Sequence, residues 1–245
     1  MSMIDRRAAL AAGAGALTAI LAGRAVAGGP SQWFDLKDAS GAKLPNMRLP
    51  VELTQELDSL PGIVWTGAAQ PTVTFVEVHD YNCPWCQAAA QDLHALLAEA
   101  DDVRIGFMNN PVLSAASVEA AKVELALTRL MGPQVAYDFY RAMYSRRRRA
   151  DGAAALAAAR VAIDGRVSAV APAGARVTMA DVERMARDPA TAAALEAQMR
   201  LARALGLAAT PSFVIGGVAV QGYPGRETLR RMVAAMRRCD EPACE

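Results

Sequence analysis

Two cysteines, Cys83 and Cys86, are the residues of this sequence whose types and spacing most clearly suggest chemistry, and only Pro84 and Trp85 separate them. A spacing of i, i+3 lets two sulfur atoms meet on one face of a helical turn, so the pair can form a disulfide and open it again. A thiol becomes an effective nucleophile when its pKa is lowered, and a helix N-terminus lowers it through unpaired N–H groups and the helix dipole. The spacing predicts thiol–disulfide exchange, with Cys83 as nucleophile and Cys86 as resolving thiol.

The segments around the cysteines indicate how they are positioned. Residues 73–78 form a β-branched and aromatic run that is typical of a buried central strand. A helix is expected to begin at the cysteines and to end near Ala100, and residues 103–108 predict a second strand. Pro84 suits the first helical turn, where its missing N–H costs nothing. A strand, a helix and a strand in this order predict a parallel crossover.

Glu77 is the one carboxyl in the predicted central strand. A buried carboxyl is costly unless it has a partner or a role. Burial also raises its pKa, which suits proton exchange with Cys86. We favour this role over an edge-strand glutamate that points to water. His79 lies in the turn predicted before the cysteines, where it could have a modest influence on Cys83.

From Ser114 to about Leu205 the sequence predicts a largely helical segment, with a loop over residues 165–177. Four consecutive arginines, residues 146–149, stand near a predicted helix end. We favour a solvated helix C-terminus that complements the dipole over a binding patch for these arginines.

A second motif, Thr210-Pro211, precedes renewed strand character. Residues 212–215 and 218–220 flank two glycines and predict a β-hairpin. An amphipathic helix is expected over residues 226–238. Taken alone, Thr-Pro is an ordinary junction between a loop and a strand. Together with the upstream cysteine pair, it becomes a candidate part of the same site.

The order of these motifs resembles the DsbA-like branch of the thioredoxin superfamily, over roughly residues 73–238. The resemblance implies an α/β, thioredoxin-like fold with a helical insertion at about 114–205. It further implies that Pro211 is cis and lies beside the active-site disulfide, and that the backbone of Thr210 pairs with a bound substrate chain. The implied function is dithiol–disulfide exchange in exported proteins, as an oxidase or an isomerase. No cofactor is expected, because the disulfide itself carries the electrons.

The dipeptide between the cysteines departs from the best-known oxidase of that family, which has a histidine there. Pro84 and Trp85 offer no positive charge to a thiolate. In addition, the threonine before Pro211 resembles the isomerase-type relatives. Both departures weaken the case for strong oxidase activity and leave the direction of electron flow open.

The other two cysteines, Cys239 and Cys244, stand at the C-terminus. We favour a local structural disulfide between them over a second redox relay. A zinc site formed by all four cysteines is disfavoured, because this pair follows a separate helix. The alternative function from another class is a binding protein that holds a soft metal such as Cu(I) with Cys83 and Cys86. The methionines do not cluster as a copper-binding tract would require.

Composition excludes other classes of protein. The 245 residues include 26 basic and 25 acidic side chains, for a net charge of +1, so no positive field indicates nucleic acid as a partner. Only two histidines are present, too few for a multi-histidine metal site.

The N-terminus has the pattern of a secretory signal. Arg6-Arg7 precede an apolar run over residues 8–22, and Ala25-Val26-Ala27 has the small residues of a cleavage site. The run is shorter than the roughly 20 residues that span a bilayer, which disfavours a membrane anchor. The arginine pair also resembles a twin-arginine signal. We expect a periplasmic protein that acts on exported substrate proteins and depends on an unidentified membrane redox partner.

The predicted organisation comprises a signal peptide (1–27), an N-terminal leader of uncertain structure (28–69), a DsbA-like domain (70–238) and a C-terminal tail with the second cysteine pair (239–245).

Processing of the N-terminus is directly testable. The exported protein should begin at Gly28, because a signal peptidase cleaves after the small residues that end at Ala27. N-terminal sequencing of the protein from a periplasmic extract checks this expectation. An uncleaved chain held in the inner membrane would contradict it.

Overall fold

A computed structural model describes residues 32–146, 149–170 and 177–244 of the chain. The predicted signal peptide therefore lies outside the described residues. Within the described ranges, no helix is long and apolar enough to cross a membrane.

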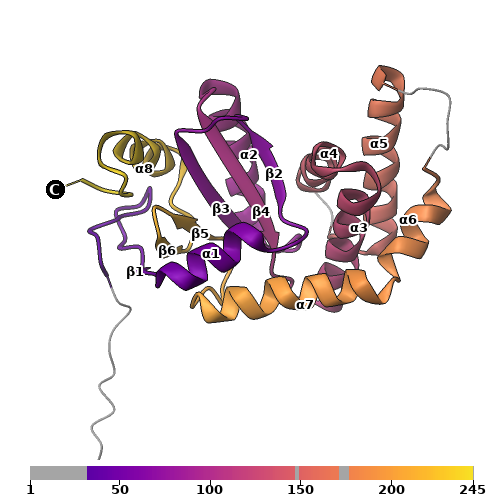
Figure 1. The fold of residues 1–245 in the computed structure, drawn as a ribbon, viewed down its shortest axis with the longest axis horizontal. Coiled ribbons are helices and arrows are strands. Elements are labelled where there is room, and N and C mark those ends of the chain that lie inside the picture. Colours follow the sequence, from indigo (N-terminus) through magenta and orange to yellow (C-terminus); the bar gives the residue numbers. More distant parts are fainter. Residues whose placement is uncertain (1–31, 147–148, 171–176, 245) are drawn as a thin grey trace, which may run out of the picture.

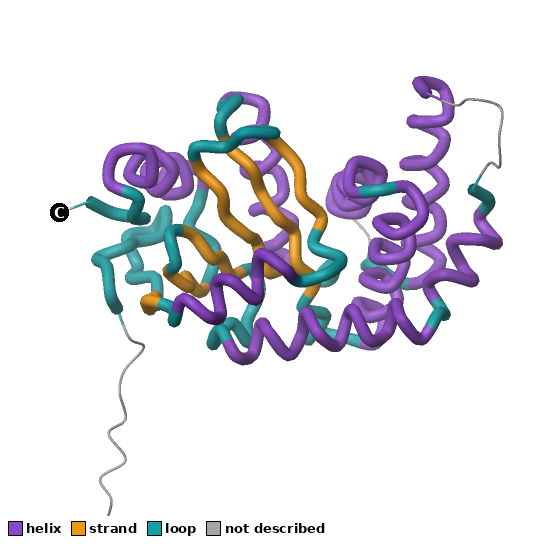
Figure 2. The backbone as a smooth tube through the Cα atoms, viewed as in Figure 1, coloured by secondary structure: helices purple, strands orange, loops and turns teal. Residues whose placement is uncertain are grey.

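A six-stranded mixed sheet forms the centre of the structure (Figures 1 and 2). The strand predicted as central lies between its partners, parallel to the strand that follows the cysteine helix and antiparallel to the first strand of the hairpin. The predicted parallel crossover and hairpin are therefore confirmed. In spatial order the strands are β1 (Asn46–Arg48), β6 (Val218–Gln221), β5 (Ser212–Ile215), β3 (Val73–His79), β4 (Val103–Asn109) and β2 (Val64–Gly67).

Helices cover both faces of the sheet and extend beyond one end of it (Figure 1). In chain order they are α1 (Val51–Ser59), α2 (Pro84–Glu99), α3 (Ala115–Met131), α4 (Pro133–Tyr144), α5 (Gly152–Val170), α6 (Met179–Ala186), α7 (Pro189–Ala204) and α8 (Arg226–Cys239).

The alternation of side chains along β3 divides the core between the two faces of the sheet. Phe75 packs in the cluster that contains Leu93 of α2 and Leu229 of α8. Val76 instead packs in the cluster that contains Leu57 of α1 and Leu201 of α7. This two-residue period places Glu77 on the face covered by α2, since it has the same parity as Phe75.

The helical insertion α3–α7 follows the stop and start signals of the sequence. Gly132 ends α3 with a positive φ of 85°, and Pro133 then begins α4. Thr178 and Asp181 form a capping box at the start of α6. The predicted loop over 165–177 is wrong in its first part, because α5 continues to Val170. Its alanine-rich sequence favours helix strongly enough to include Gly165.

The segment predicted as a leader contributes regular structure. It contains β1, α1 and β2, and the two strands form opposite edges of the sheet. These elements are short, and their partners are distant in the sequence. β1 pairs with β6 near the C-terminus, and β2 pairs with β4.

A buried glutamine ties α7 to the strand that follows the cysteine helix. Gln198 is fully buried; its Oε1 accepts the backbone N–H of Asn109 at 2.9 Å, and its Nε2 donates to the carbonyl of Pro61 at 3.2 Å. Asn109, the last residue of β4, is 1% exposed, so bulk water cannot replace this bond.

Loss of this tie should destabilise the fold measurably. Gln198→Ala leaves the buried N–H of Asn109 unpaired, and we expect the free energy of unfolding to fall by about 1–3 kcal/mol. Urea unfolding followed by circular dichroism measures this loss. Glu196→Ala on the exposed side of the same helix is the control and should change stability by less than about 0.5 kcal/mol. Equal stability of both variants would show that the tie is energetically neutral.

Candidate active site

The two central cysteines occupy the start of α2. Cys83 is the N-cap residue and Pro84 the first residue of the helix. The Sγ of Cys83 accepts the backbone N–H of Cys86 at 3.4 Å. The same sulfur lies 3.2 Å from the carbonyl oxygen of Thr210. The helix start therefore surrounds one sulfur atom with hydrogen-bonding groups, and both cysteines are free thiols.

The environment separates the pKa values of the two thiols. Hydrogen bonds, first from the Cys86 side chain and then from backbone N–H groups, lower the pKa of Cys83 to about 6, although burial opposes the shift. Burial raises the pKa of Cys86 well above its ordinary value, with the Cys83 side chain adding to the shift. At neutral pH the reduced site therefore holds a thiolate at Cys83 and a thiol at Cys86.

This thiolate also affects stability. The folded pKa of Cys83, about 6, lies below the value of about 8.5 expected for an unfolded cysteine. Its contribution to the reduced protein is complete above the unfolded pKa and is lost as the pH falls through the folded one.

Both cysteines are buried: 6% of Cys83 is accessible, against 0% of Cys86. The carbonyl oxygen of Thr210 lies 3.2 Å from the Cys83 sulfur. Cys83 nonetheless borders a surface pocket, whereas Cys86 does not line it.

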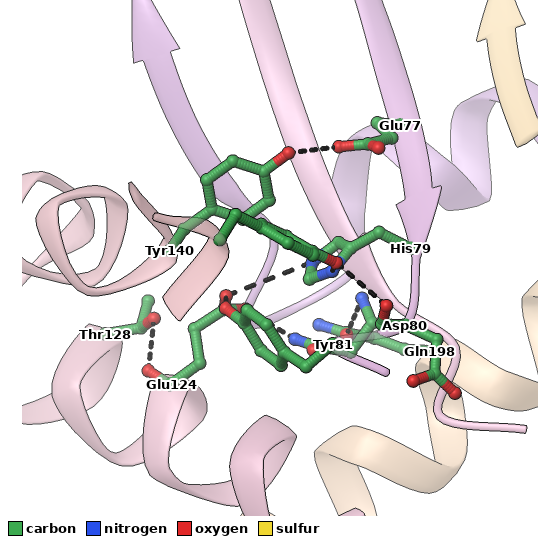
Figure 3. A network of polar contacts seen from close by, with 10 residues as sticks. Glu77, His79, Asp80, Tyr81, Glu124, Thr128, Tyr140 and Gln198 are labelled. Carbon is green, nitrogen blue, oxygen red and sulfur yellow. Dashed lines mark hydrogen bonds and ion pairs between the residues drawn. The ribbon is translucent and has the colours of Figure 1, made fainter. Parts of the chain in front are cut away.

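Glu77 is buried on the α2 side of the sheet, so the interpretation as an edge-strand residue in water is wrong. Its Oε2 accepts the hydroxyl of Tyr140 at 2.6 Å, and its Oε1 has no hydrogen-bond partner among the described residues (Figure 3). Burial raises its pKa to about 8, with smaller contributions from Cys83 and Glu124. At neutral pH the carboxyl therefore mostly carries a proton.

Residues of the insertion contribute further polar groups to this buried region, and they were not among the site residues predicted from the sequence (Figure 3). Glu124 of α3 is fully buried, accepts the hydroxyl of Tyr81, and accepts Nδ2 of Asn109 at 2.5 Å. Burial raises its pKa to about 7. The available signal was a lone glutamate inside the apolar run from Val123 to Leu127, which is unusual for a solvated helix face.

His79 has a different environment from the predicted turn. It ends β3, is fully buried, and its Nδ1 lies 3.0 Å from the hydroxyl of Tyr144. That hydroxyl donates to the carbonyl of Asp80 at 2.9 Å, so Nδ1 carries the hydrogen of the imidazole. Burial lowers the pKa of His79 to about 3. A neutral imidazole cannot provide a positive charge for Cys83.

A second wall of the site comes from the C-terminal part of the chain. The Thr210-Pro211 peptide bond is cis. Both residues line a groove of about 580 Å³ together with Trp85, which is 64% exposed, and Tyr223. The groove is also lined by Asp38, Ala39, Ser40, Lys43, Leu44 and Pro45. An exposed indole beside a groove is suited to contact an apolar segment of another chain.

The remaining cysteines lie outside this site. Cys239 and Cys244 form a disulfide at the end of α8. Among the described residues, no group of three or more histidine, cysteine or carboxylate side chains could hold a metal ion. The copper-binding alternative therefore gains no support from the side chains around Cys83 and Cys86.

The low pKa of Cys83 should depend on its neighbour. In Cys86→Ala the largest lowering hydrogen bond is absent, so the pKa of Cys83 should rise from about 6 toward, but not to, about 8.5, because the backbone N–H groups remain. The pH dependence of the alkylation rate measures this pKa, and mass spectrometry identifies Cys83 as the labelled residue. An unchanged midpoint, or faster labelling of Cys86 in the wild type, would refute the assignment.

Comparison with known proteins supports the fold. A family model described as thioredoxin matches residues 59–235. A search of curated proteins found no match. Among solved structures, a thioredoxin-like oxidoreductase from Silicibacter pomeroyi DSS-3 is 27% identical, with a TM-score of 0.62 over 74% of this chain and 98% of that chain.

Two further structures have the same fold. A periplasmic thioredoxin-like protein from Salmonella enterica serovar Typhimurium is 23% identical, with a TM-score of 0.64 over 78% of this chain and 99% of that chain. The thiol-disulfide exchange protein alpha-DsbA2 from Wolbachia pipientis is 23% identical, with a TM-score of 0.62 over 76% and 94% of the two chains. The family model spans more than half of the sequence. The chain therefore belongs to the thioredoxin family and has the fold of its DsbA-like members.

Proposed function

We propose that this protein catalyses dithiol–disulfide exchange in exported proteins through Cys83 and Cys86. The observation that carries the proposal is the separation of the two thiols, with a pKa of about 6 for Cys83 and a raised pKa for Cys86. One sulfur is thereby suited to attack and to leave, and the other to resolve.

In the oxidising direction, a substrate thiolate attacks Sγ of Cys83 in the Cys83–Cys86 disulfide. A mixed disulfide forms, and Cys86 leaves as a thiolate. A second substrate thiolate then attacks the substrate sulfur, and Cys83 leaves as a thiolate. The substrate loses two electrons and gains a disulfide, while the protein gains both electrons. Reduction uses the same steps in the opposite order, beginning with attack by Cys83. In isomerisation, Cys83 attacks a substrate disulfide and a different substrate thiolate then displaces Cys83, so that no electrons are transferred overall.

Glu77 has the role of proton donor to Cys86 in this scheme. The departing Cys86 thiolate is buried and takes up a proton because burial disfavours its charge. Glu77, with a pKa of about 8, holds a proton on the same face of the sheet, and its charge interacts with that of Cys86. Transfer leaves one negative charge on the Glu77 carboxylate in place of one on sulfur.

Substrate contacts are assigned to the groove beside Cys83. The carbonyl oxygen of Thr210 lies 3.2 Å from the Cys83 sulfur, so the backbone before Pro211 borders the reacting atom. A substrate chain can pair there with backbone groups while Trp85 contacts its apolar side chains. Pro84 begins the helix, so the dipeptide acts through helix geometry and contact area, without adding charge.

The cellular setting follows the sequence pattern. The signal-like N-terminus supports a periplasmic location, and one structural neighbour is described as a periplasmic thioredoxin-like protein. Regeneration of the disulfide or dithiol after each turnover requires a redox partner, for which a membrane protein is the proposed source.

Substitution of each cysteine tests the function. Cys83→Ala should abolish catalysed insulin reduction, because no nucleophile remains, whereas Cys86→Ala should accumulate mixed disulfides at Cys83 that mass spectrometry detects. The double variant Cys239→Ser/Cys244→Ser is the matched control and should retain the wild-type rate. Full activity of Cys83→Ala, or loss of activity only in the C-terminal double variant, would overturn the proposal.

A further inference from the structure

A pocket of about 310 Å³ lies beside Cys83, distinct from the groove at Pro211. Its walls come from the active-site turn, from the first turn of α2 and from the chain after α4. Tyr81, Cys83 and Tyr144 form part of it, and Arg146 and Arg149 line it as well. These arginines belong to the basic run for which the sequence favoured a solvated helix end. Arg147 and Arg148 lie outside the described residues.

The active site holds this basic segment at both ends. Nε2 of Gln87, on α2, donates to the carbonyls of Tyr144 at 2.9 Å and Arg146 at 2.8 Å. Asn82, in the turn before Cys83, accepts the N–H of Ala150 at 2.9 Å and donates to its carbonyl at 3.0 Å. Four hydrogen bonds therefore attach the chain on either side of the arginines to the residues that flank the nucleophile.

The charges of the pocket are unbalanced. Its described lining includes two arginines and no carboxylate. Neither Arg146 nor Arg149 forms an ion pair within the described part of the chain, and the one hydrogen bond of the Arg146 guanidinium goes to the carbonyl of Ala154 at 3.1 Å. The carboxylate of Asp80 is buried, accepts the N–H groups of Asn82 and Leu113, and does not line the pocket.

We propose that this pocket binds the carboxylate of an acidic residue that adjoins the reacting cysteine of a substrate polypeptide. The inference rests on the proposed thiol–disulfide exchange, because Cys83 must be joined to the substrate when the pocket is filled. The groove beside Pro211 then takes the chain on one side of the substrate cysteine, and the arginine pocket takes the acidic side chain on the other. The two arginines that line the pocket together with Cys83 attract a carboxylate, and their charge partly offsets the repulsion between that carboxylate and the reacting thiolate.

Peptides with two cysteines provide the test. One cysteine is flanked by Glu, Gln or Lys in three otherwise identical peptides, and their oxidation by the oxidised full chain is followed by acid quenching and chromatography. The wild type should oxidise the Glu peptide about 3- to 10-fold faster than the Gln peptide at low salt, and the Lys peptide more slowly still. The preference should shrink in high salt, because exposed charges are screened.

Arginine variants separate recognition from the intrinsic reactivity of each peptide. A flanking glutamate changes the intrinsic reactivity of the peptide cysteine by the same factor for every variant. A change in the ratio of Glu to Gln rates between variants therefore reports on the pocket alone. The double variant Arg146→Gln/Arg149→Gln sets the ratio of Glu to Gln rates expected without the pocket charges. Arg149→Gln alone should lower the ratio close to that value. Arg160→Gln, which removes an exposed charge from α5 of the same insertion, is the control and should keep the wild-type ratio.

The outcomes distinguish the two proposals. Equal Glu-to-Gln ratios in the wild type and in the Arg146→Gln/Arg149→Gln variant would refute the arginine pocket while leaving exchange activity intact. A loss of preference in Arg160→Gln of the same size would assign the effect to net charge and also refute the pocket. Failure to oxidise any of the three peptides would instead count against the proposed function.

Discussion

Hydrogen bonding at the first turn of α2 places negative charge on one sulfur and keeps it from the other. Cys83 stands at the N-cap, where hydrogen bonds from the Cys86 side chain and then from the Cys86 N–H lower its pKa to about 6. Cys86 lies three residues further along the helix, in the core, where burial favours the neutral thiol. The proposed chemistry depends on this difference, and the fold serves to maintain it by keeping one side of α2 against the sheet.

The helical insertion completes that environment. Tyr140 and Tyr144 of α4 reach across to Glu77 and to the end of β3, and Glu124 of α3 adds a second buried carboxyl (Figure 3). Low polarity around these groups raises the pKa of both carboxyls and keeps His79 neutral. The insertion therefore acts on the redox site through burial and hydrogen bonds, and the same helices supply the basic segment beside Cys83.

Two surfaces of different character meet at the nucleophile. The groove at Pro211 is bounded by Trp85 and Tyr223 and presents apolar area, whereas the pocket on the side of α4 presents guanidinium groups. Residues close to the cysteines line both surfaces: Trp85 lines the groove, and Gln87 lines the pocket. A substrate chain that passes over Cys83 would meet both, so selectivity in this protein can combine apolar contact with charge.

Local patterns in the sequence determined the strand before the cysteines, the helix that they begin, the β-hairpin and most helix ends, because caps, prolines and side-chain periodicity act over a few residues. The cysteine pair and Glu77 were identifiable for the same reason, whereas Thr210-Pro211 became a candidate only through the upstream cysteines and the family resemblance. Only the tertiary structure decided that β1 and β2 close the sheet edges, that Glu124 and Tyr140 join Glu77 in a buried network, and that Arg146 and Arg149 border Cys83. Those outcomes depend on contacts between segments tens of residues apart. Local sequence patterns do not specify which distant residue donates a hydrogen bond to a buried group or covers a buried charge.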